Sequence, residues 1–363
     1  MDKNNVVVIM AGGAGERFWP MSRDAKPKQF IDILGTGKSL IRQTYERFLK
    51  LCPPENIYII TNKNYKTLVQ EQIPEIRSEN IFCEPTRKNT APCIAYAAYK
   101  IYAANPDANM VVAPSDHIIL KEDAFCEIVT TALKASAGSN KLITLGITPS
   151  RPDTEYGYIQ FIQDSINKED KRMKKVKTFT EKPNKELAES FIQSGDFLWN
   201  SGIFVWSAKT IINAFEKHQP ELNFVFKEAI PHYNTNSELD YMKTAYEACK
   251  SISIDYAIME KAENVFVFIS DLGWSDLGSW RALFEYRPKD STNNAICGNN
   301  ILVYDSKNCI ITMPKDKMVL IQGLDDYIVA ESDNVLMICK KSQEGQIRKF
   351  VNDIKINTGE KYI

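Results

Sequence analysis

The chain of 363 residues is predicted to adopt an α/β fold, with a doubly wound, mostly parallel sheet and a small C-terminal β-solenoid-like module. The sheet is predicted because short β-rich runs alternate with helix-length segments through the first half of the chain. The first run, residues 6–10, is apolar and β-branched and breaks directly into glycines, as a buried parallel strand does before a ligand-binding loop. The module is predicted because several short strand-like runs follow residue 290, separated by turn-forming residues.

The first half of the chain is expected to consist of βαβ units. Strands are expected over residues 6–10, 56–61, 80–84, 109–113 and 141–145. Helices are expected over residues 40–51, 64–72, 90–104 and 124–137. Ligands of such sheets bind beyond the carboxyl ends of the strands. The loops 11–23, 84–92 and 114–117 each follow a predicted strand, so we expect them to converge on one cleft.

The remaining residues are expected to form a second lobe and the module. From residue 153 the pattern predicts mixed strands over 156–161, 176–181 and 203–206, with helices over 185–194 and 210–217. A polar stretch at residues 290–294 indicates a boundary, so one domain is predicted over 1–290, in halves of about 1–150 and 151–290. The module over 291–363 has expected strands at 300–304, 309–312, 318–322, 327–330 and 335–339 and a closing helix at 342–354. Because it is too small to bury much surface alone, we expect it to pack on the first domain or on a second subunit.

The composition excludes several classes of protein. A hydrophobic content of 44% and a charged content of 25% are those of an ordinary globular protein, and a net charge of −1 argues against a nucleic-acid partner. No apolar stretch is long enough for a membrane helix, and the N-terminus lacks the pattern of a signal peptide. Eight cysteines without a Cys-x-x-Cys pair indicate reduced thiols, so a cytoplasmic location is expected. Three scattered histidines argue against a His-rich metal site.

The loop after the first strand, Gly12-Gly13-Ala14-Gly15-Glu16-Arg17, has the composition of a phosphate-binding loop. Glycine lets the backbone approach a ligand, its N–H groups donate to an anion, and Arg17 and Lys28 add positive charge. A dinucleotide-binding loop would carry a third glycine and run directly into a helix. A P-loop ending in Gly37-Lys38-Ser39 would need a glycine where the chain has Asp32. Neither of these two patterns is complete here.

Two aspartates follow or accompany predicted turns. Asp116 comes directly after a predicted strand, and Asp276 lies in a segment framed by Trp274 and Trp280. Either aspartate could simply cap a helix or form a turn. A carboxylate in such a place is also suited to hold Mg²⁺ against phosphate oxygens, and Mg²⁺ needs only one or two of them.

Polar groups in three further segments suit a phosphorylated sugar or a nucleotide. Lys182 ends a predicted strand, and its ammonium is a point charge that can bind a phosphate. Asn200 offers an amide suited to sugar hydroxyls, although a turn before the strand at 203–206 explains it equally well. The segment 84–92 precedes a long helix, whose N-terminus can face a base or a phosphate.

Residues 12–23, followed by Lys26-Pro27-Lys28-Gln29-Phe30, closely resemble the opening motif of the sugar-1-phosphate nucleotidyltransferases. The variant Phe-Trp-Pro-Met-Ser-Arg within this motif is similar to that of the mannose-1-phosphate guanylyltransferase branch, and the resemblance extends over about residues 6–340. One departure is Glu16, where the family more often has threonine or a small residue. Larger members carry an additional C-terminal cupin-like isomerase domain, and this chain is expected to be a short form without it.

The resemblance implies a Rossmann-like catalytic domain over residues 1–290 that transfers GMP from GTP to mannose 1-phosphate, giving GDP-mannose and pyrophosphate. It implies nucleotide binding by Ala11, Gly12, Gly13, Gly15, Glu84, Arg87, Asn89, Thr90 and Ser115. It implies Arg17, Lys28 and Lys182 as catalytic charges. It implies sugar-phosphate binding by Gly157, Glu181, Lys182 and Asn200. It implies Asp116 and Asp276 as ligands of Mg²⁺.

The reaction expected from this resemblance is an in-line attack of the sugar phosphate on the α-phosphorus of GTP. The expected assembly is a homodimer. Two other functions stay open on the sequence alone. One is a nucleotidyltransferase for another hexose or heptose 1-phosphate, and the other is a non-catalytic regulatory subunit that binds a sugar nucleotide.

Overall fold

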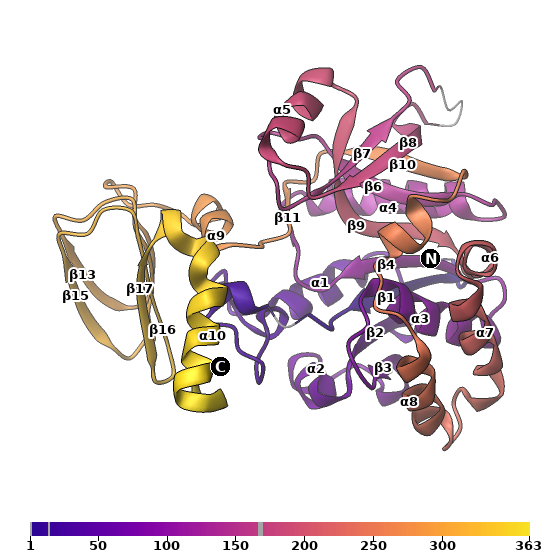
Figure 1. Ribbon diagram of the computed structural model, residues 1–363, viewed down its shortest axis with the longest axis horizontal. Coiled ribbons are helices and arrows are strands. Elements are labelled where there is room, and N and C mark those ends of the chain that lie inside the picture. The colour runs from indigo at the N-terminus through magenta and orange to yellow at the C-terminus, as the bar shows by residue number, and fades with distance from the viewer. Residues whose placement is uncertain (1, 14, 166–169) are drawn as a thin grey trace. The chain divides into compact units, whose positions relative to one another are not determined.

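The computed structural model describes residues 2–13, 15–165 and 170–363, so Ala14 of the predicted glycine loop lies outside the described residues. The chain forms two compact units (Figure 1). The first unit comprises residues 1–12, 44–115 and 119–274, and the second unit comprises residues 13–43, 116–118 and 275–363. Each unit therefore collects segments that are distant in the sequence. The predicted domain boundary at residue 290 stays a prediction.

A nine-stranded sheet forms the centre of the first unit, in the order β3-β2-β1-β4-β9-β6-β10-β8-β7. Its strands are β1 (Asn5–Met10), β2 (Ile57–Asn62), β3 (Ile81–Glu84), β4 (Asn109–Pro114), β6 (Leu142–Ile147), β7 (Gly157–Phe161), β8 (Met173–Glu181), β9 (Phe197–Ser207) and β10 (Val265–Ser270). Two further strands, β5 (Ile118–Ile119) and β11 (Trp274–Ser275), have two residues each. The predicted α/β class is confirmed.

The sheet is parallel where βαβ units build it and antiparallel where the second lobe joins it. The strand β1 pairs in parallel with β2 and β4, β2 pairs in parallel with β3, and β6 pairs in parallel with β10. The long strand β9 runs antiparallel to β4, β6 and β7, and β8 runs antiparallel to β7 and β10. The sheet is thus mixed, because β9 enters it between two parallel groups.

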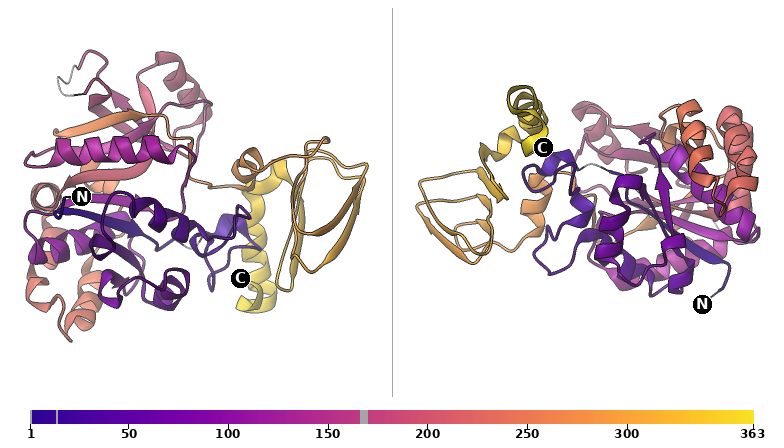
Figure 2. Two further views of the ribbon diagram at one scale, coloured as in Figure 1. Left: turned by 180° about the vertical axis from the view of Figure 1, so that it is seen from behind. Right: turned by 90° about the horizontal axis from the view of Figure 1, so that it is seen from below.

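Helices cover the sheet in the first unit (Figures 1 and 2). They are α2 (Lys66–Gln72), α3 (Thr90–Ala104), α4 (Glu122–Ser136), α5 (Lys185–Ser194), α6 (Ala208–His218), α7 (Pro220–Glu228) and α8 (Glu238–Ala248), while α1 (Leu40–Phe48) begins in the second unit and ends in the first. Alternate strand residues such as Val6 and Val8 pack in one core cluster with α3, α6, α7 and α8. The helix α4 packs across β4, β6, β9 and β10. None of the described helices is long and apolar enough to cross a membrane.

The structure adds elements that the sequence pattern did not predict. The helices α7 and α8 and the strand β10 fill the stretch between residues 218 and 271, and a π-helical turn runs over Asp255–Met259. The strand β9 begins at Phe197, although a strand was expected only from residue 203. Asn200 therefore lies inside a strand and not in a turn before one. The pattern failed there because Asn200, Ser201 and Gly202 are turn-forming residue types, and Gly202 indeed has a φ of +67°.

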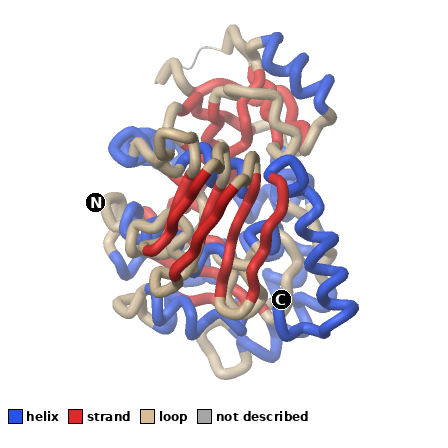
Figure 3. The backbone as a smooth tube through the Cα atoms, turned by 90° about the vertical axis from the view of Figure 1, so that its left-hand side faces the viewer, coloured by secondary structure: helices blue, strands red, loops and turns tan. Residues whose placement is uncertain are grey.

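The C-terminal part of the second unit is a solenoid of short strands (Figure 3). Its elements are α9 (Trp280–Tyr286), β12 (Ala295–Cys297), β13 (Asn300–Tyr304), β14 (Ile310–Thr312), β15 (Met318–Gln322), β16 (Tyr327–Ser332), β17 (Val335–Lys340) and α10 (Ile347–Thr358). The chain alternates between two sheets, one in the order β12-β14-β16-β17 and one of β13 and β15. Successive strands within each sheet are parallel except β16 and β17. The predicted β-solenoid-like module is confirmed.

Two apolar clusters hold the second unit together. The interior of the solenoid contains Cys309, Ile311 and Ile321. The other cluster joins solenoid residues such as Met337 to Phe18 and to other apolar residues of segment 13–43. The module therefore packs on the segment that follows β1. The closing helix starts at Ile347, after a 3₁₀ turn over Lys341–Gln346, and not at residue 342.

Candidate active site

The loop after β1 is shaped by a glycine that no other residue could replace without strain. Gly15 has a φ of +69°, and a Cβ atom built on it would lie 2.7 Å from the Cβ of Lys28 and 2.7 Å from Oγ of Ser22. Side chains rarely adopt such a φ, and 2.7 Å is closer than Cβ atoms approach other atoms. The amide of Gln29 donates to the carbonyl of Gly13 over 3.0 Å. The loop is thus folded tightly onto the segment that carries Lys28.

The ammonium of Lys28 is buried and makes three polar contacts. Nζ donates to the carbonyl oxygens of Asp276 over 2.9 Å and Leu277 over 3.0 Å, and lies 2.8 Å from Oδ2 of Asp116. An ammonium has three donors, so these acceptors satisfy all of them. Leu277 has a φ of +46°, which turns two successive carbonyls toward the same atom. Lys28 therefore joins both predicted metal ligands to the loop after β1.

The carboxylate of Asp116 lies among positive groups. Burial acts to raise its pKa, but the charge of Lys28 and the neighbouring His117 outweigh burial, so that the pKa lies below its usual value. The carboxylate of Asp276 accepts the N–H of Gly278 over 2.9 Å through Oδ1. The carboxylate oxygens of both aspartates are suited to act as ligands of a cation.

A cavity of about 350 Å³ opens in the second unit around these groups. It is lined by Gly15, Arg17, Phe18, Lys28, Asp116, His117, Asp276, Gly278 and Arg348. Arg17 donates from Nη1 to the carbonyl of Gly278 over 3.5 Å. Two arginines, one lysine and two aspartates thus line one space. Such a surplus of positive charge suits a phosphate chain better than a neutral ligand.

The first unit carries most of the predicted nucleotide residues, which follow β1, β3 and β4, while Gly13 and Gly15 belong to the second unit. Glu84 is buried at the end of β3, accepts the hydroxyl of Tyr246 over 3.0 Å, and lies 3.3 Å from where a Cβ on Gly12 would stand. Burial raises the pKa of Glu84 to about 7, against the opposing effect of the Tyr246 hydrogen bond. The N–H of Ala11 donates to Ile60 over 2.8 Å, so it serves the sheet and not a ligand. Ser115 is also buried next to β1, where its N–H donates to Met10 over 3.0 Å.

The segment between β3 and α3 ends in the predicted helix cap. Asn89 caps α3 by accepting the N–H of Thr90, and it has a φ of +67°. The hydroxyl of Thr90 accepts the N–H of Ile254 over 2.8 Å. Arg87 is exposed, and its guanidinium donates to the hydroxyl of Tyr65. These contacts fix the segment in front of α3.

The predicted sugar-phosphate residues of β7 and β8 are neighbours. Gly157 pairs with Glu181 in the sheet, and a Cβ on Gly157 would come within 2.3 Å of Oε1 of Glu181. Burial, and then repulsion from Asp255, raise the pKa of Glu181 to about 7, while Lys182 acts to lower it. Lys182 is exposed and has a φ of +46°.

Asn200 belongs to the same group, because β9 pairs with β7. Its Nδ2 donates to Oδ1 of Asp255 over 2.8 Å, and its Oδ1 accepts the N–H of Gly202 over 3.1 Å. A bulge in the pairing of β6 with β9, between Thr144 and Gly146, lies opposite it. The amide is thus held at both ends.

Strained backbone coincides with the predicted site in both units. Among the described residues, nine that are not glycine have a positive φ, and the two that are neither Asn nor Asp are Lys182 and Leu277. Such conformations cost free energy and persist where the surroundings enforce them, which is frequent at functional sites. The predicted residues are divided between the two units, with Arg17, Lys28, Asp116 and Asp276 in the second. Their roles stay predictions.

Three residues in these groups were missed at the level of sequence. His117 and Arg348 line the cavity of the second unit, and Asp255 contacts Asn200 in the first. His117 directly follows Asp116, so its position in the motif could have indicated it. Arg348 and Asp255 lie outside every motif considered and carry no local signal of this kind.

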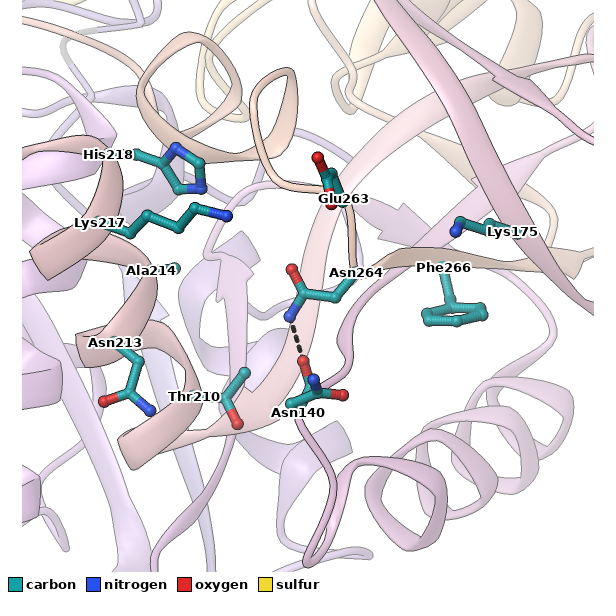
Figure 4. A pocket seen from close by; sticks show the side chains of 10 residues that line it. All are labelled: Asn140, Lys175, Thr210, Asn213, Ala214, Lys217, His218, Glu263, Asn264 and Phe266. Carbon is teal, nitrogen blue, oxygen red and sulfur yellow. Dashed lines mark hydrogen bonds between the residues drawn. The ribbon is translucent and has the colours of Figure 1, made fainter.

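A larger cavity, of about 540 Å³, lies in the first unit away from all these residues (Figure 4). It is lined among others by Lys175, Lys217, His218 and Glu263. Asn140 and Asn264, which are hydrogen-bonded there, precede the first residues of β6 and β10. The cavity thus lies at the amino ends of these parallel strands, whereas open α/β sheets bind ligands at the carboxyl ends. We do not include it in the candidate site.

Comparison with known families places two matches along the chain. Residues 6–293 match the nucleotidyl transferase family, and residues 298–354 match the mannose-phosphate isomerase/GMP-like β-helix domain. The first match alone covers most of the chain, including both groups of predicted residues up to Gly278.

Individual relatives agree with these matches. The chain is 35% identical over 368 residues to mannose-1-phosphate guanylyltransferase 2 of Escherichia coli O157:H7, covering 99% of this chain and 75% of that protein. It is 36% identical over 364 residues to a mannose-1-phosphate guanylyltransferase of Salmonella montevideo, covering 98% and 75%. A crystal structure from Thermus thermophilus, described as a mannose-1-phosphate geranyltransferase, superposes with a TM-score of 0.86 at 28% identity over 97% of this chain and 99% of that one.

Proposed function

Because the chain belongs to the mannose-1-phosphate guanylyltransferase family of nucleotidyl transferases, we propose that it transfers GMP from GTP to mannose 1-phosphate, giving GDP-mannose and pyrophosphate. The observation that carries this proposal is the cavity of the second unit. There Lys28, Asp116 and Asp276 meet beside two arginines. A polyanionic nucleotide in a chain of net charge −1 requires such a local concentration of positive groups.

The proposed chemistry needs no protein nucleophile. The phosphate of mannose 1-phosphate is already anionic and attacks the α-phosphorus of GTP in line, so that the bond to the β-phosphate breaks and pyrophosphate leaves. The protein then has to align the two substrates and neutralise the charge that accumulates on the leaving group. In this proposal Arg17 and Lys28 neutralise that charge, and Lys182 binds the phosphate of the sugar.

Lys28 needs a change of partner to take this role. Its ammonium is saturated by Asp116 and by two backbone carbonyls. It can contact a phosphate only by giving up one of these acceptors. Asp116 is the acceptor that a cation would take, so cation binding and the release of Lys28 would go together.

The donor set at this cavity fits Mg²⁺. Asp116 and Asp276 both line it, and within the described part of the chain no cluster of three His, Cys, Asp or Glu side chains could hold a metal by itself. Mg²⁺ usually binds through one or two carboxylates together with substrate phosphates and waters. We propose that these two aspartates hold Mg²⁺, which would supply charge neutralisation to the reacting phosphates.

The remaining predicted residues would bind the nucleotide and the sugar. The nucleotide is assigned to Gly12, Gly13, Gly15, Glu84, Arg87, Asn89, Thr90 and Ser115. Ala11 is assigned to it as well, although its N–H donates to Ile60 and is not the group that would bind the nucleotide. Gly157, Glu181 and Asn200 are assigned to the sugar. The assignment is supported by the proximity of Glu181 and Asn200 to Gly157, because a Cβ built on Gly157 would meet Oε1 of Glu181 and would lie 3.5 Å from the Cβ of Asn200. Carboxylates and amides are suitable partners for sugar hydroxyls.

We also propose a cytoplasmic homodimer. The support for the homodimer is an apolar patch of exposed side chains on β13 and β15, formed by Leu302, Tyr304, Met318 and Leu320. Leu302 and Leu320 lie opposite each other in register, and a patch of this kind is typical of an interface. Light scattering of the purified chain would give the mass of two copies, and a single-copy mass would contradict the proposal.

The test of the proposed reaction is a substrate panel in both directions. The purified chain is incubated with Mg²⁺, pyrophosphate and either GDP-mannose, another GDP-hexose or UDP-glucose, and the release of GTP or UTP is measured. GDP-mannose is expected to react fastest, and GTP with mannose 1-phosphate is expected to release pyrophosphate. A clear preference for a UDP-sugar or another GDP-sugar would overturn the assignment of substrate. Binding of GDP-mannose without any turnover would indicate a non-catalytic subunit.

A further inference from the structure

Asp255 has no part in the proposed reaction, although it contacts Asn200 and acts electrostatically on Glu181, two groups assigned to the sugar. It is partly buried in the first unit, and its Oδ1 accepts from Nδ2 of Asn200 over 2.8 Å. It also lies close enough to Glu181 for their charges to repel each other. Burying a carboxylate beside another acid costs free energy of folding unless the carboxylate accepts hydrogen bonds from a partner.

The contact with Asp255 determines how the amide of Asn200 is oriented. The N–H of Gly202 points at one end of the amide over 3.1 Å and requires an acceptor there. The carboxylate of Asp255 faces the other end and requires a donor. Only one of the two flips of the amide satisfies both neighbours. That flip leaves the second Nδ2–H of Asn200 for a further acceptor.

Asp255 is itself held in place by the core and by the first residues of α3. It opens the π-helical turn Asp255–Met259, whose last three residues are fully buried. The preceding residue, Ile254, donates its N–H to the hydroxyl of Thr90, and Ile252 accepts the N–H of Ala91 over 3.1 Å. π-Helical turns are rare and frequently occur at functional sites.

The charges around Asp255 favour a ligand that brings hydroxyl groups. Glu181, Glu260 and Asp255 are acids, and Lys182 is the cation that acts on Glu181. Carboxylates accept hydrogen bonds and cannot donate them while ionised. A hexose 1-phosphate supplies hydroxyl donors for the acids and a phosphate for Lys182.

We propose that Asp255 is a positioning residue for sugar recognition, which orients the amide of Asn200 so that its second Nδ2–H binds a hydroxyl of the hexose 1-phosphate. This inference rests on the proposed function, because it names a determinant of the sugar half of that site. Asp255 acts through Asn200 and does not touch the reacting phosphates. Its loss should therefore weaken binding of the sugar phosphate and leave binding of GTP unchanged.

The test compares Asp255→Ala, Asp255→Asn, Asn200→Ala and the double variant D255A/N200A in the forward reaction. Asp255→Ala should raise the KM for mannose 1-phosphate about tenfold or more, with the KM for GTP within about twofold of the wild type. Asp255→Asn keeps an acceptor for Nδ2 and should raise the same KM by less than about threefold. The double variant should lose no more than Asn200→Ala alone, because two residues in one contact are not additive.

Glu238→Gln serves as a matched control for the loss of a carboxylate in the same unit. Glu238 is buried and bonded to Tyr96 and Lys100 over 2.6 Å each. Its substitution should lower Tm and leave both KM values within about twofold.

Three results would overturn the inference: an unchanged KM for mannose 1-phosphate in Asp255→Ala, additive losses in the double variant, or equal increases of both KM values together with a lower Tm. If the wild type uses a different sugar 1-phosphate, the proposed substrate fails, and the same comparisons with that sugar decide on Asp255. If the wild type binds no sugar 1-phosphate in calorimetry, both proposals fail.

Discussion

At the scale of single residues, Lys28 shows how one buried charge can organise a site. Its three contacts join the loop after β1, Asp116 and the turn at Leu277 within the second unit. Removing it would take from Asp116 its main counter-charge and from the carbonyls of Asp276 and Leu277 the donor that Lys28 supplies. A buried acceptor that loses its partner costs more than the hydrogen bond itself contributed. The residue is thus needed for the shape of the cavity as well as for its charge.

We expect Lys28→Ala and Asp276→Ala each to lower turnover about a hundredfold or more, because each removes a charge that faces the reacting phosphates. The measurement is the rate of pyrophosphate release at saturating GTP and mannose 1-phosphate. Lys26→Ala is the control, because Lys26 is exposed in the same motif and lies outside the cavity lining. Near-normal turnover in both Lys28→Ala and Asp276→Ala would refute the roles given to them.

The buried carboxyl of Glu84 makes stability depend on pH. Burial raises its pKa to about 7 in the folded chain, from 4.5, so the folded state holds this proton more tightly than the unfolded state does. The contribution of Glu84 to the free energy of unfolding is therefore fully present below pH 4.5 and is lost as the pH rises through 7. The loss is on the order of 3 kcal/mol.

Urea unfolding of the wild type and Glu84→Gln at pH 5 and pH 8 measures this contribution. Between pH 5 and pH 8 the free energy of unfolding should fall more for the wild type than for the variant, because the variant has no proton to release at this position. The comparison isolates Glu84 from Glu181, whose pKa burial and Asp255 also raise. An identical loss in the two proteins would show that Glu84 does not titrate in this range.

At the scale of elements, α10 links the solenoid to the cavity. Its first residue, Ile347, is buried in the cluster with Trp280 and Met337, and the next residue, Arg348, lines the cavity. The helix is thus anchored where its arginine is presented. A guanidinium binds phosphate oxygens in a bidentate manner and keeps its charge at every relevant pH.

We expect Arg348→Ala to raise the KM for GTP about tenfold, because a charge-assisted hydrogen bond to a phosphate is lost. The KM for mannose 1-phosphate should stay within about twofold. Lys349→Ala removes an exposed charge from the next position of the same helix and should change neither value. Equal effects of the two substitutions would mean that only the net charge of α10 matters.

Helices and strands could be predicted where the apolar periodicity of a segment and the turn residues beside it indicate the same structure. The helix α3 and the strand β15 begin and end where the sequence predicts, because apolar periodicity and flanking turn residues agree there. The start of β9 could not be predicted, since Asn200 and its two successors are turn-forming residue types. The strand forms there because residues 197–199 pair with β7 and Asn200 pairs with Gly146 of β6. Tertiary pairing overrides local preference in such strands.

The site could be predicted in its residue types and not in its contacts. Motifs indicated Lys28, Asp116 and Asp276, whereas their meeting at one ammonium depends on segments separated by long stretches of chain. Neither Asp255 nor Arg348 lies in a recognisable motif. The fold brings each of them to its group from a distant part of the chain. A single sequence holds no signal for such a placement.

At the scale of the whole molecule, the second unit is assembled from three separate segments of the chain. One cluster unites Phe18 and Trp19 from the segment after β1 with solenoid residues such as Met337. The solenoid therefore supports the loop that carries Gly15 and Lys28. Substitutions on its inner face should therefore lower turnover, and substitutions on its outer face should not.

Two neighbouring substitutions in β17 test this dependence. Met337 is 6% exposed and Leu336 is 55% exposed. Met337→Asp places a charge in the apolar cluster and should lower stability by about 3 kcal/mol or more, with a loss of turnover at temperatures where the chain is still folded. Leu336→Asp should leave both nearly unchanged. Thermal unfolding and pyrophosphate release measure the two effects, and equal behaviour of the pair would contradict the supporting role of the inner face.

The three-segment construction of the second unit also sets the order of events on the ribosome. Phe18 and Trp19 are synthesised early, whereas most of the other residues of their apolar cluster lie from Leu277 onward and are added last. At roughly 5–20 residues per second, these aromatic side chains wait for ten seconds or longer for their partners. During most of synthesis, the nascent chain thus exposes the apolar side chains of Phe18 and Trp19.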